Sequence, residues 1–240
     1  MAGHAYIAGA LPDARERARP AHRRVALLLS LAAGCVLALL GVWALADHVF
    51  AIEVRDAALL HDFTRLNGTH LGAVCRTLLR LLEPTLFTLW ALAVTLFALA
   101  RNRVRLAIAL ALVMGLAPLS AELLKHALAH SHVAIGYTRL GAASYPSGHA
   151  TAATALALSA ALVVPARRRA LALLCALALI AAVGVALLIR EWHLPSDVLG
   201  GYLLGVAWIS LALAAVRASQ ICWPRTGRAT RATPAAGESG

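Results

Sequence analysis

The chain alternates between long apolar segments and short clusters of charged residues. Six segments are apolar enough and long enough to cross the roughly 30 Å hydrocarbon core of a bilayer as helices. They are residues 25–46, 84–100, 106–124, 148–165, 170–189 and 197–216. The pattern therefore predicts an all-α fold, a polytopic membrane bundle of six transmembrane helices.

Residues 49–80 have a different pattern, in which apolar and charged positions interleave at helical spacing. The recurring apolar positions are Val54, Ala58, Leu59, Phe63 and Leu66. This spacing predicts an amphipathic helix that lies at the membrane interface or packs over the end of the bundle.

The arginines predict which side of the membrane each loop faces. They cluster in residues 1–24, 101–105, 167–169 and 217–240, segments that six crossings place on one side. Cytoplasmic loops carry the excess of Lys and Arg, so both termini are expected in the cytoplasm. The domains are then a basic cytoplasmic tail (1–24), a membrane domain (25–216, with segment 49–80 extracytoplasmic) and a basic disordered cytoplasmic tail (217–240).

Composition supports this class and excludes others. Hydrophobic residues make up 61% of the 240 residues, more than soluble domains carry. The net charge of +11 does not indicate nucleic-acid binding, because the arginines flank apolar runs instead of forming one basic face. The Ala, Leu and Arg bias suggests a multi-pass protein of a bacterial plasma membrane.

No metal or cofactor is expected. The four cysteines lie far apart without a CxxC pair, which predicts neither a zinc site nor a disulfide framework. His126, His130 and His132 have a spacing that resembles a metal cluster, but no carboxylate accompanies them in that loop.

One candidate site for chemistry lies at the start of the fourth span. Ser147, Gly148 and His149 stand where free backbone N–H groups and the helix dipole attract an anion such as phosphate. Gly148 lets the backbone approach that anion closely. His149 can donate a proton to a leaving alkoxide.

Two further outer loops carry complementary groups. His193 and Asp197 are four residues apart at the start of the sixth span, so the carboxylate can bond one imidazole nitrogen and leave the other free to attack phosphorus. Lys125, at the end of the third span, supplies positive charge for phosphoryl transfer. Helix starts and ends on one face of a bundle can converge, which favours a single site.

These residues, read together, resemble the type 2 phosphatidic acid phosphatase superfamily. The resemblance rests on Lys125, on Tyr145-Pro-Ser-Gly-His149, and on His193-x-Pro-Ser-Asp197 followed by Val198-Leu-Gly-Gly201. It implies a metal-independent phosphatase that works through a phosphohistidine. By the resemblance, His193 is the nucleophile, Asp197 orients it and His149 is the general acid. Lys125, Ser147 and the Gly148 amide hold the phosphate oxygens.

The sequence departs from the family pattern at two arginines. The family's first motif continues to Arg-Pro, where this chain has His132-Val133, and its third begins with Ser-Arg, where this chain has Ala186-Leu187. Arg190 is a candidate substitute for one phosphate-binding arginine. Arg139 and a protonated His132 are candidates for the other.

The expected function is hydrolysis of a lipid phosphate monoester, resembling phosphatidic acid, at the extracytoplasmic face. A polyprenyl-diphosphate phosphatase and a lipid phosphotransferase are alternatives with the same catalytic residues. The missing arginines also leave open a catalytically weak or silent membrane scaffold. A small transporter is disfavoured, because only Pro118 and Glu122 interrupt the spans.

Overall fold

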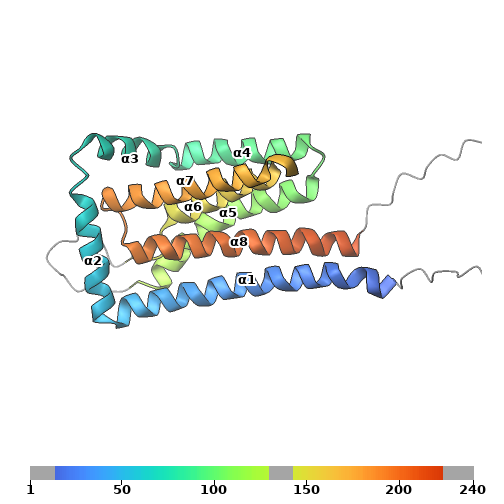
Figure 1. The fold of residues 1–240 in the computed structure, drawn as a ribbon, viewed down its shortest axis with the longest axis horizontal. Helices are drawn as coiled ribbons and strands as arrows, with labels where there is room; N and C mark the ends of the chain where they lie inside the picture. Colours follow the sequence, from blue (N-terminus) through green and yellow to red (C-terminus); the bar gives the residue numbers. More distant parts are fainter. Residues whose placement is uncertain (1–13, 130–142, 224–240) are drawn as a thin grey trace, which may run out of the picture.

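The regular structure is helical throughout residues 14–129 and 143–223, the part of the chain that the computed structural model describes. Figure 1 shows most helices side by side along one axis, with α2 lying across one end. The helices are α1 (Ala14–His48), α2 (Phe50–Thr64), α3 (His70–Arg80), α4 (Pro84–Ala100), α5 (Val104–Ala127), α6 (Gly148–Val163), η1 (Ala166–Arg168), α7 (Arg169–Ile189) and α8 (Pro195–Cys222).

The helices differ in how well their lengths suit a membrane crossing. Within the described residues, α1, α5, α7 and α8 are long and apolar enough to span, and α3 with α4 qualifies as a pair bent by 59°. The proline at the start of α4 fits this break, because proline favours the first helical position. α6 is apolar but has 16 residues. By length and composition, the described residues therefore contain four helices that could span a membrane, or five if the bent pair counts as one, compared with the six predicted.

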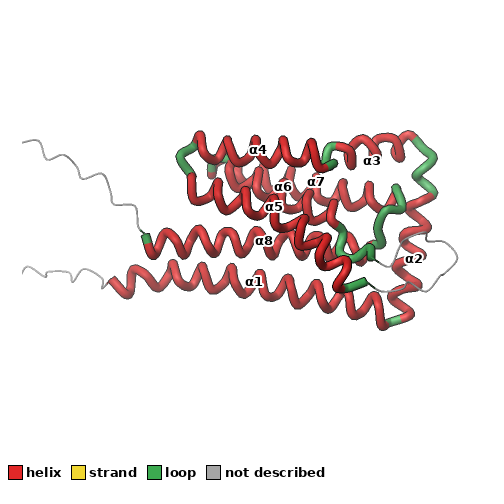
Figure 2. Tube along the Cα trace, turned by 180° about the vertical axis from the view of Figure 1, so that it is seen from behind, coloured by secondary structure: helices red, strands yellow, loops and turns green. Residues whose placement is uncertain are grey.

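The predicted boundaries agree with the helices except at three places. α1 begins at Ala14 within the basic tail, and α8 continues to Cys222 past the predicted end at 216. The end of α8 is held by Arg105, whose guanidinium donates to Ser219 O at 2.8 Å and Trp223 O at 2.6 Å. The amphipathic segment 49–80 forms two helices, α2 and α3, and the turn between them is visible in Figure 2.

The buried face of α2 differs from the one predicted. Asp56 and Leu60 are buried, and Leu59, expected on the apolar face, is 51% exposed. Asp56 and Leu60 share a face because they are one helical turn apart. The helix turns this face inward because Asp56 has hydrogen-bond partners on α8, described below.

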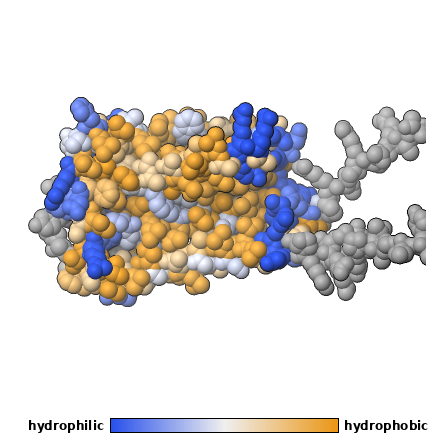
Figure 3. Space-filling model, viewed as in Figure 1, coloured by the Kyte–Doolittle hydropathy of each residue, from blue (hydrophilic) through white to orange (hydrophobic). Residues whose placement is uncertain are grey.

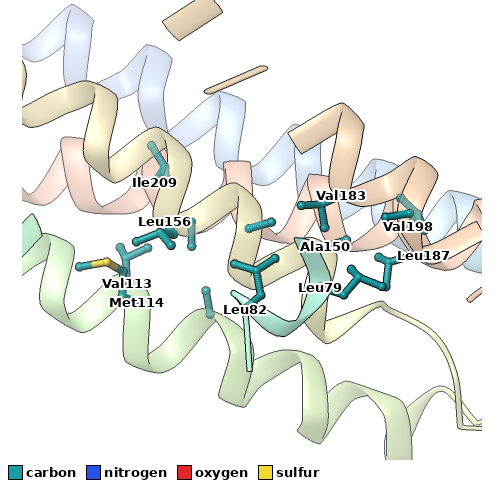
Figure 4. Packing of buried hydrophobic residues seen from close by; sticks show 14 of the residues in the cluster. Leu79, Leu82, Val113, Met114, Ala150, Leu156, Val183, Leu187, Val198 and Ile209 are labelled. Carbon is teal, nitrogen blue, oxygen red and sulfur yellow. The ribbon is translucent and has the colours of Figure 1, made fainter. Parts of the chain in front are cut away.

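Close packing of α6 against α8 fixes the geometry of the site. A Cβ added at Gly201 would lie 2.6 Å from Ser147 O, and one added at Gly205 would lie 2.6 Å from Thr154 Cβ. Small residues allow such close approach of two membrane helices. The core beneath, shown in Figure 4, is built from leucines, valines and alanines of several helices.

The surface supports a membrane location. Figure 3 shows, on the face drawn, a broad apolar band with hydrophilic residues gathered at the two ends of the bundle. The α2 end carries the loops before α6 and α8. The opposite end carries the start of α1 and the end of α8.

Candidate active site

The starts of α6 and α8 are joined directly at the α2 end of the bundle. The backbone N–H of Ser147 donates to the backbone carbonyl of Asp197 at 2.9 Å. Ser147 is fully buried and Asp197 is 1% exposed. The Ser147 side chain also caps α6 by accepting from the Ala150 N–H at 3.3 Å. The second and third candidate motifs, far apart in the sequence, therefore form one unit.

His193 and Asp197 form a buried pair. Nδ1 of His193 lies 3.3 Å from Oδ2 of Asp197, and the same oxygen accepts from the backbone N–H of Leu194 at 3.0 Å. The carboxylate thus caps the start of α8 and contacts the imidazole. A carboxylate bonded to one ring nitrogen fixes the tautomer in which that nitrogen carries the proton. Nε2 of His193 is then the nitrogen with a free lone pair.

His149 lies within electrostatic range of this pair. It interacts with His193 and Lys125, which places groups of all three candidate motifs in one neighbourhood. Its ring packs against Trp192, with ring centroids 5.4 Å apart at a tilt of 57°. The indole thus packs beside the imidazole and limits its movement.

Lys125 reaches the start of α6 from the last turn of α5. Its Nζ pairs with Glu122 Oε1 at 2.8 Å, and the lysine side chain is 19% exposed. A Cβ added at Gly148 would lie 2.7 Å from that carboxylate oxygen and 3.8 Å from Nζ. The glycine therefore leaves room for the Glu122 carboxylate and the Lys125 ammonium against the backbone of α6. The Glu122 carboxylate beside it was not predicted.

Asp56 is the main residue that the sequence interpretation missed. Its carboxylate accepts from the Ser196 hydroxyl at 2.5 Å and from the Ser196 N–H at 3.1 Å, so α2 holds the first turn of α8. The pKa of Asp56 is raised to about 6, chiefly by burial and to a smaller extent by the nearby Asp197, while the hydrogen bonds from Ser196 oppose the rise. The sequence did contain a sign of this role, because Asp56 lies on the same helical face as Leu60 and Phe63.

Arg190 lies at the same end but contacts another element. Its Nη1 donates to the side-chain oxygen of Asn67, in the turn between α2 and α3. Its Nε is buried without a partner among the described residues. Arg190 therefore has guanidinium N–H groups, Nε among them, that its contact with Asn67 does not use.

The two positions where the family's third motif has Ser-Arg are filled with apolar side chains. Ala186 and Leu187 are both fully buried, and Leu187 belongs to the same cluster as Leu79 of α3. An arginine at either position would be buried in an apolar cluster. The departure seen in the sequence is therefore built into the packing of α7 against α3.

Two predicted residues, His132 and Arg139, lie in 130–142, outside the described residues, as does His130. Across residues 14–129 and 143–223, no group of three potential ligands is gathered around a metal position. The arrangement that is described brings together a histidine–carboxylate pair, a second histidine and a lysine, groups that can support phosphoryl transfer.

Comparison with known proteins defines the class. The model of the PAP2 superfamily matches residues 83–221, which contain every described residue of the three motifs. The crystal structure of a transmembrane PAP2-type phosphatidylglycerolphosphate phosphatase from Bacillus subtilis superposes with a TM-score of 0.66 at 19% identity, covering 81% of this chain and 98% of that one. A comparison with curated protein sequences gave no match.

The fold is that of a helical membrane phosphatase. The chain belongs to the PAP2 superfamily, since the match covers more than half of its length. The resemblance inferred from the motifs is confirmed. Family and fold together support a multi-pass membrane protein that acts as a lipid phosphatase.

Proposed function

We propose that this protein hydrolyses a lipid phosphate monoester at the α2 end of the bundle, through a phosphohistidine on His193. The observation that carries the proposal is the contact between Nδ1 of His193 and Oδ2 of Asp197, at 3.3 Å, with both side chains buried. The buried carboxylate holds the proton on Nδ1 and stabilises the imidazolium that forms when Nε2 attacks.

In the first step, the Nε2 lone pair forms a bond to phosphorus as the bond from phosphorus to the lipid oxygen breaks. His149, as the imidazolium, gives its proton to that oxygen, which leaves as an alcohol. In the second step, water attacks the phosphohistidine and His149 takes one of its protons. The P–N bond breaks, inorganic phosphate leaves and His193 is regenerated.

The phosphate oxygens face positive charge and helix-start donors in this proposal. Lys125, the hydroxyl of Ser147 and the amide of Gly148 are the groups assigned to them, and each lies at the start of α6 or against it. Arg190 is assigned to the same phosphate through the donors that Asn67 does not engage. Arg139 and His132 are assigned as the remaining candidates.

The location of the site favours a lipid over a soluble ester. The bundle has an apolar surface, and α2 lies across the end where the site is found (Figures 1 and 3). A phosphate at a bilayer surface meets this end while its chains stay among the apolar helices. We propose six crossings, counting α4 and α6, with both termini in the cytoplasm and the site on the opposite face.

Phosphate release from purified protein in detergent tests this function. A panel of phosphatidic acid, phosphatidylglycerol phosphate, a polyprenyl phosphate, a polyprenyl diphosphate and a soluble aryl phosphate is compared. We expect a monoester lipid to be the best substrate, with His193→Ala inactive and the exposed His70→Ala unchanged. Rapid quenching with radiolabelled substrate should trap an acid-labile, base-stable phosphate on the wild-type protein only.

The other outcomes identify the alternatives. Preference for the diphosphate indicates a polyprenyl-diphosphate phosphatase, and label passing to an added alcohol acceptor indicates a phosphotransferase. No turnover of any member of the panel, with His193 unlabelled, would overturn the proposal in favour of a silent scaffold.

A further inference from the structure

The end of the bundle opposite the catalytic site contains an arginine-lined hollow. It has a volume of about 490 Å³, within the usual size range of small-molecule sites. Four arginines from three elements line it: Arg103 and Arg105 at the start of α5, Arg169 at the start of α7 and Arg217 near the end of α8. The proposed catalytic mechanism uses none of them.

None of the four arginines has a recorded ion pair with an Asp or Glu among residues 21–129 and 143–223, where side chains are described. The acidic residues at the end of α1, on α2 and beside the start of α8 lie at the α2 end of the bundle, and Glu83 lies at the break between α3 and α4. The recorded contacts of the four arginines are to neutral carbonyls, such as Arg103 Nη1 to Leu162 O at 3.3 Å. The Nε of Arg169 is buried and has no described partner. Four cations facing one hollow therefore favour an anionic ligand.

A second, apolar groove begins at the same place. It has a volume of about 400 Å³ and runs between α5 and α8, lined by side chains that include Ile108, Leu112, Leu116, Leu211 and Ala215. Arg105 and Val216 line both the hollow and the groove, so the two adjoin at these residues. A ligand that fills both has an anionic head and an apolar chain.

The length of the groove fits one leaflet of a bilayer. From Arg105 to Leu116, α5 rises about 16 Å at 1.5 Å per residue. Half of a hydrocarbon core is about 15 Å thick. An acyl chain lying in the groove would thus reach the middle of the membrane while its headgroup stays beside the arginines.

We propose that the hollow and groove bind one anionic phospholipid, with its phosphate among Arg103, Arg105, Arg169 and Arg217 and an acyl chain between α5 and α8. The guanidinium forks of arginine match phosphate oxygens in pairs. The excess of Lys and Arg that orients a membrane protein explains arginines near the surface of this end, but it does not require four of them to line the same hollow. Arg167 and Arg168, in η1, are exposed and do not line it.

The test compares two double variants that remove the same charge from the same end of the protein. Arg169→Gln with Arg217→Gln changes the hollow, and Arg167→Gln with Arg168→Gln is the matched control. The probe is phosphatidylglycerol, a phosphodiester, added to purified protein in neutral detergent, with retained lipid counted by native mass spectrometry. Phosphatidylcholine and inorganic phosphate are run in parallel.

We expect wild type and the control to retain phosphatidylglycerol and the hollow variant to bind it roughly 25-fold more weakly, since each arginine contributes about a factor of five. Ala215→Trp, which fills the groove and keeps all four arginines, should also lose the lipid. Equal loss in both double variants would overturn the proposal, as would equal retention of phosphatidylcholine or full competition by millimolar phosphate. Monodisperse gel filtration of each variant excludes misfolding as the cause.

Discussion

Asp56 on α2 and Ser196 on α8 stand 140 positions apart and are joined by hydrogen bonds to both the hydroxyl and the N–H of the serine. Ser196 immediately precedes Asp197, so the helix that crosses the end of the bundle fixes the turn that carries the His193 pair. α2 therefore supports the candidate site, although it contributes no group to the chemistry proposed above.

Replacing Asp56 by Asn should change how stability depends on pH. Burial raises the pKa of Asp56 to about 6 in the folded protein, above its ordinary value of 3.8. The protonated form thus favours folding, and this contribution is lost as the pH rises through about 6. The Tm of the wild type should therefore fall by several degrees between pH 5 and pH 7, and the Tm of Asp56→Asn should not show this fall.

Thermal unfolding in detergent at several pH values measures this difference. Asp62→Asn is the control, because Asp62 lies on the same helix with its side chain 68% exposed. Parallel Tm curves for wild type and Asp56→Asn would show that Asp56 does not titrate in this range.

His149→Ala should harm substrates with poor leaving groups most. If His149 protonates the departing oxygen, its loss should lower kcat by about 10²–10⁴ for an alkyl phosphate, whose alkoxide is a strong base. Nitrophenolate, the leaving group of a nitrophenyl phosphate, departs without protonation, so kcat for that ester should fall far less. Steady-state kinetics on the two esters decides the point, since an equal loss for both would assign His149 to binding instead.

Arg190→Ala should lower kcat/KM by about 10²-fold, or about 2.7 kcal/mol, if Arg190 contacts the transferred phosphate. Arg190→Lys should recover only part, because an ammonium lacks the planar fork. Asn67→Ala removes the partner that Arg190 contacts and leaves the guanidinium in place. If Asn67→Ala reproduces the full loss, Arg190 acts by holding the α2–α3 turn and not by binding phosphate.

Chelation should leave turnover nearly unchanged, because Lys125 and helix-start amides supply the positive potential in the proposed mechanism. Phosphate release with and without EDTA measures this. If EDTA abolishes activity and zinc restores it, a site that includes His126, His130 and His132 becomes the centre of the reaction.

The proposed orientation can be tested at Ala143, which is exposed and precedes the catalytic turn. In a background without the four native cysteines, Ala143→Cys should react with a membrane-impermeant thiol reagent in intact cells. A cysteine at Arg167, in the opposite loop, should react only after lysis. The reverse pattern would invert the topology.

The sequence predicted the helices well where hydrophobicity decides them. Spans 106–124, 148–165 and 170–189 match α5, α6 and α7 within a few residues, because apolar runs between charged clusters leave few alternatives. The prediction failed where a tertiary contact determines how a helix is oriented or where it ends. The inward turn of Asp56 depends on Ser196, and the extension of α8 is supported by Arg105, partners too distant for any local pattern to indicate.

The sequence predicted which residues gather at the candidate site better than it predicted the contacts that they make there. His149, His193, Asp197, Lys125 and Gly148 do gather at one end. The pairing of Lys125 with Glu122, and of Arg190 with Asn67, could not be foreseen. Small differences in packing decide which partner a long flexible side chain contacts, and the spacing of residues in the sequence does not reveal these differences.

The burial of Leu187 constrains how this protein could regain the arginine of its family's third motif. Leu187 is fully buried in the cluster that includes Leu79. An arginine introduced there alone would place an unpaired charge among leucines, at a cost of several kcal/mol, comparable to the whole stability of a domain. A single Leu187→Arg change is therefore expected to destabilise the fold strongly. A compensating change in the α3 residues that pack against position 187 would be needed, so the residues of these two helices depend on each other.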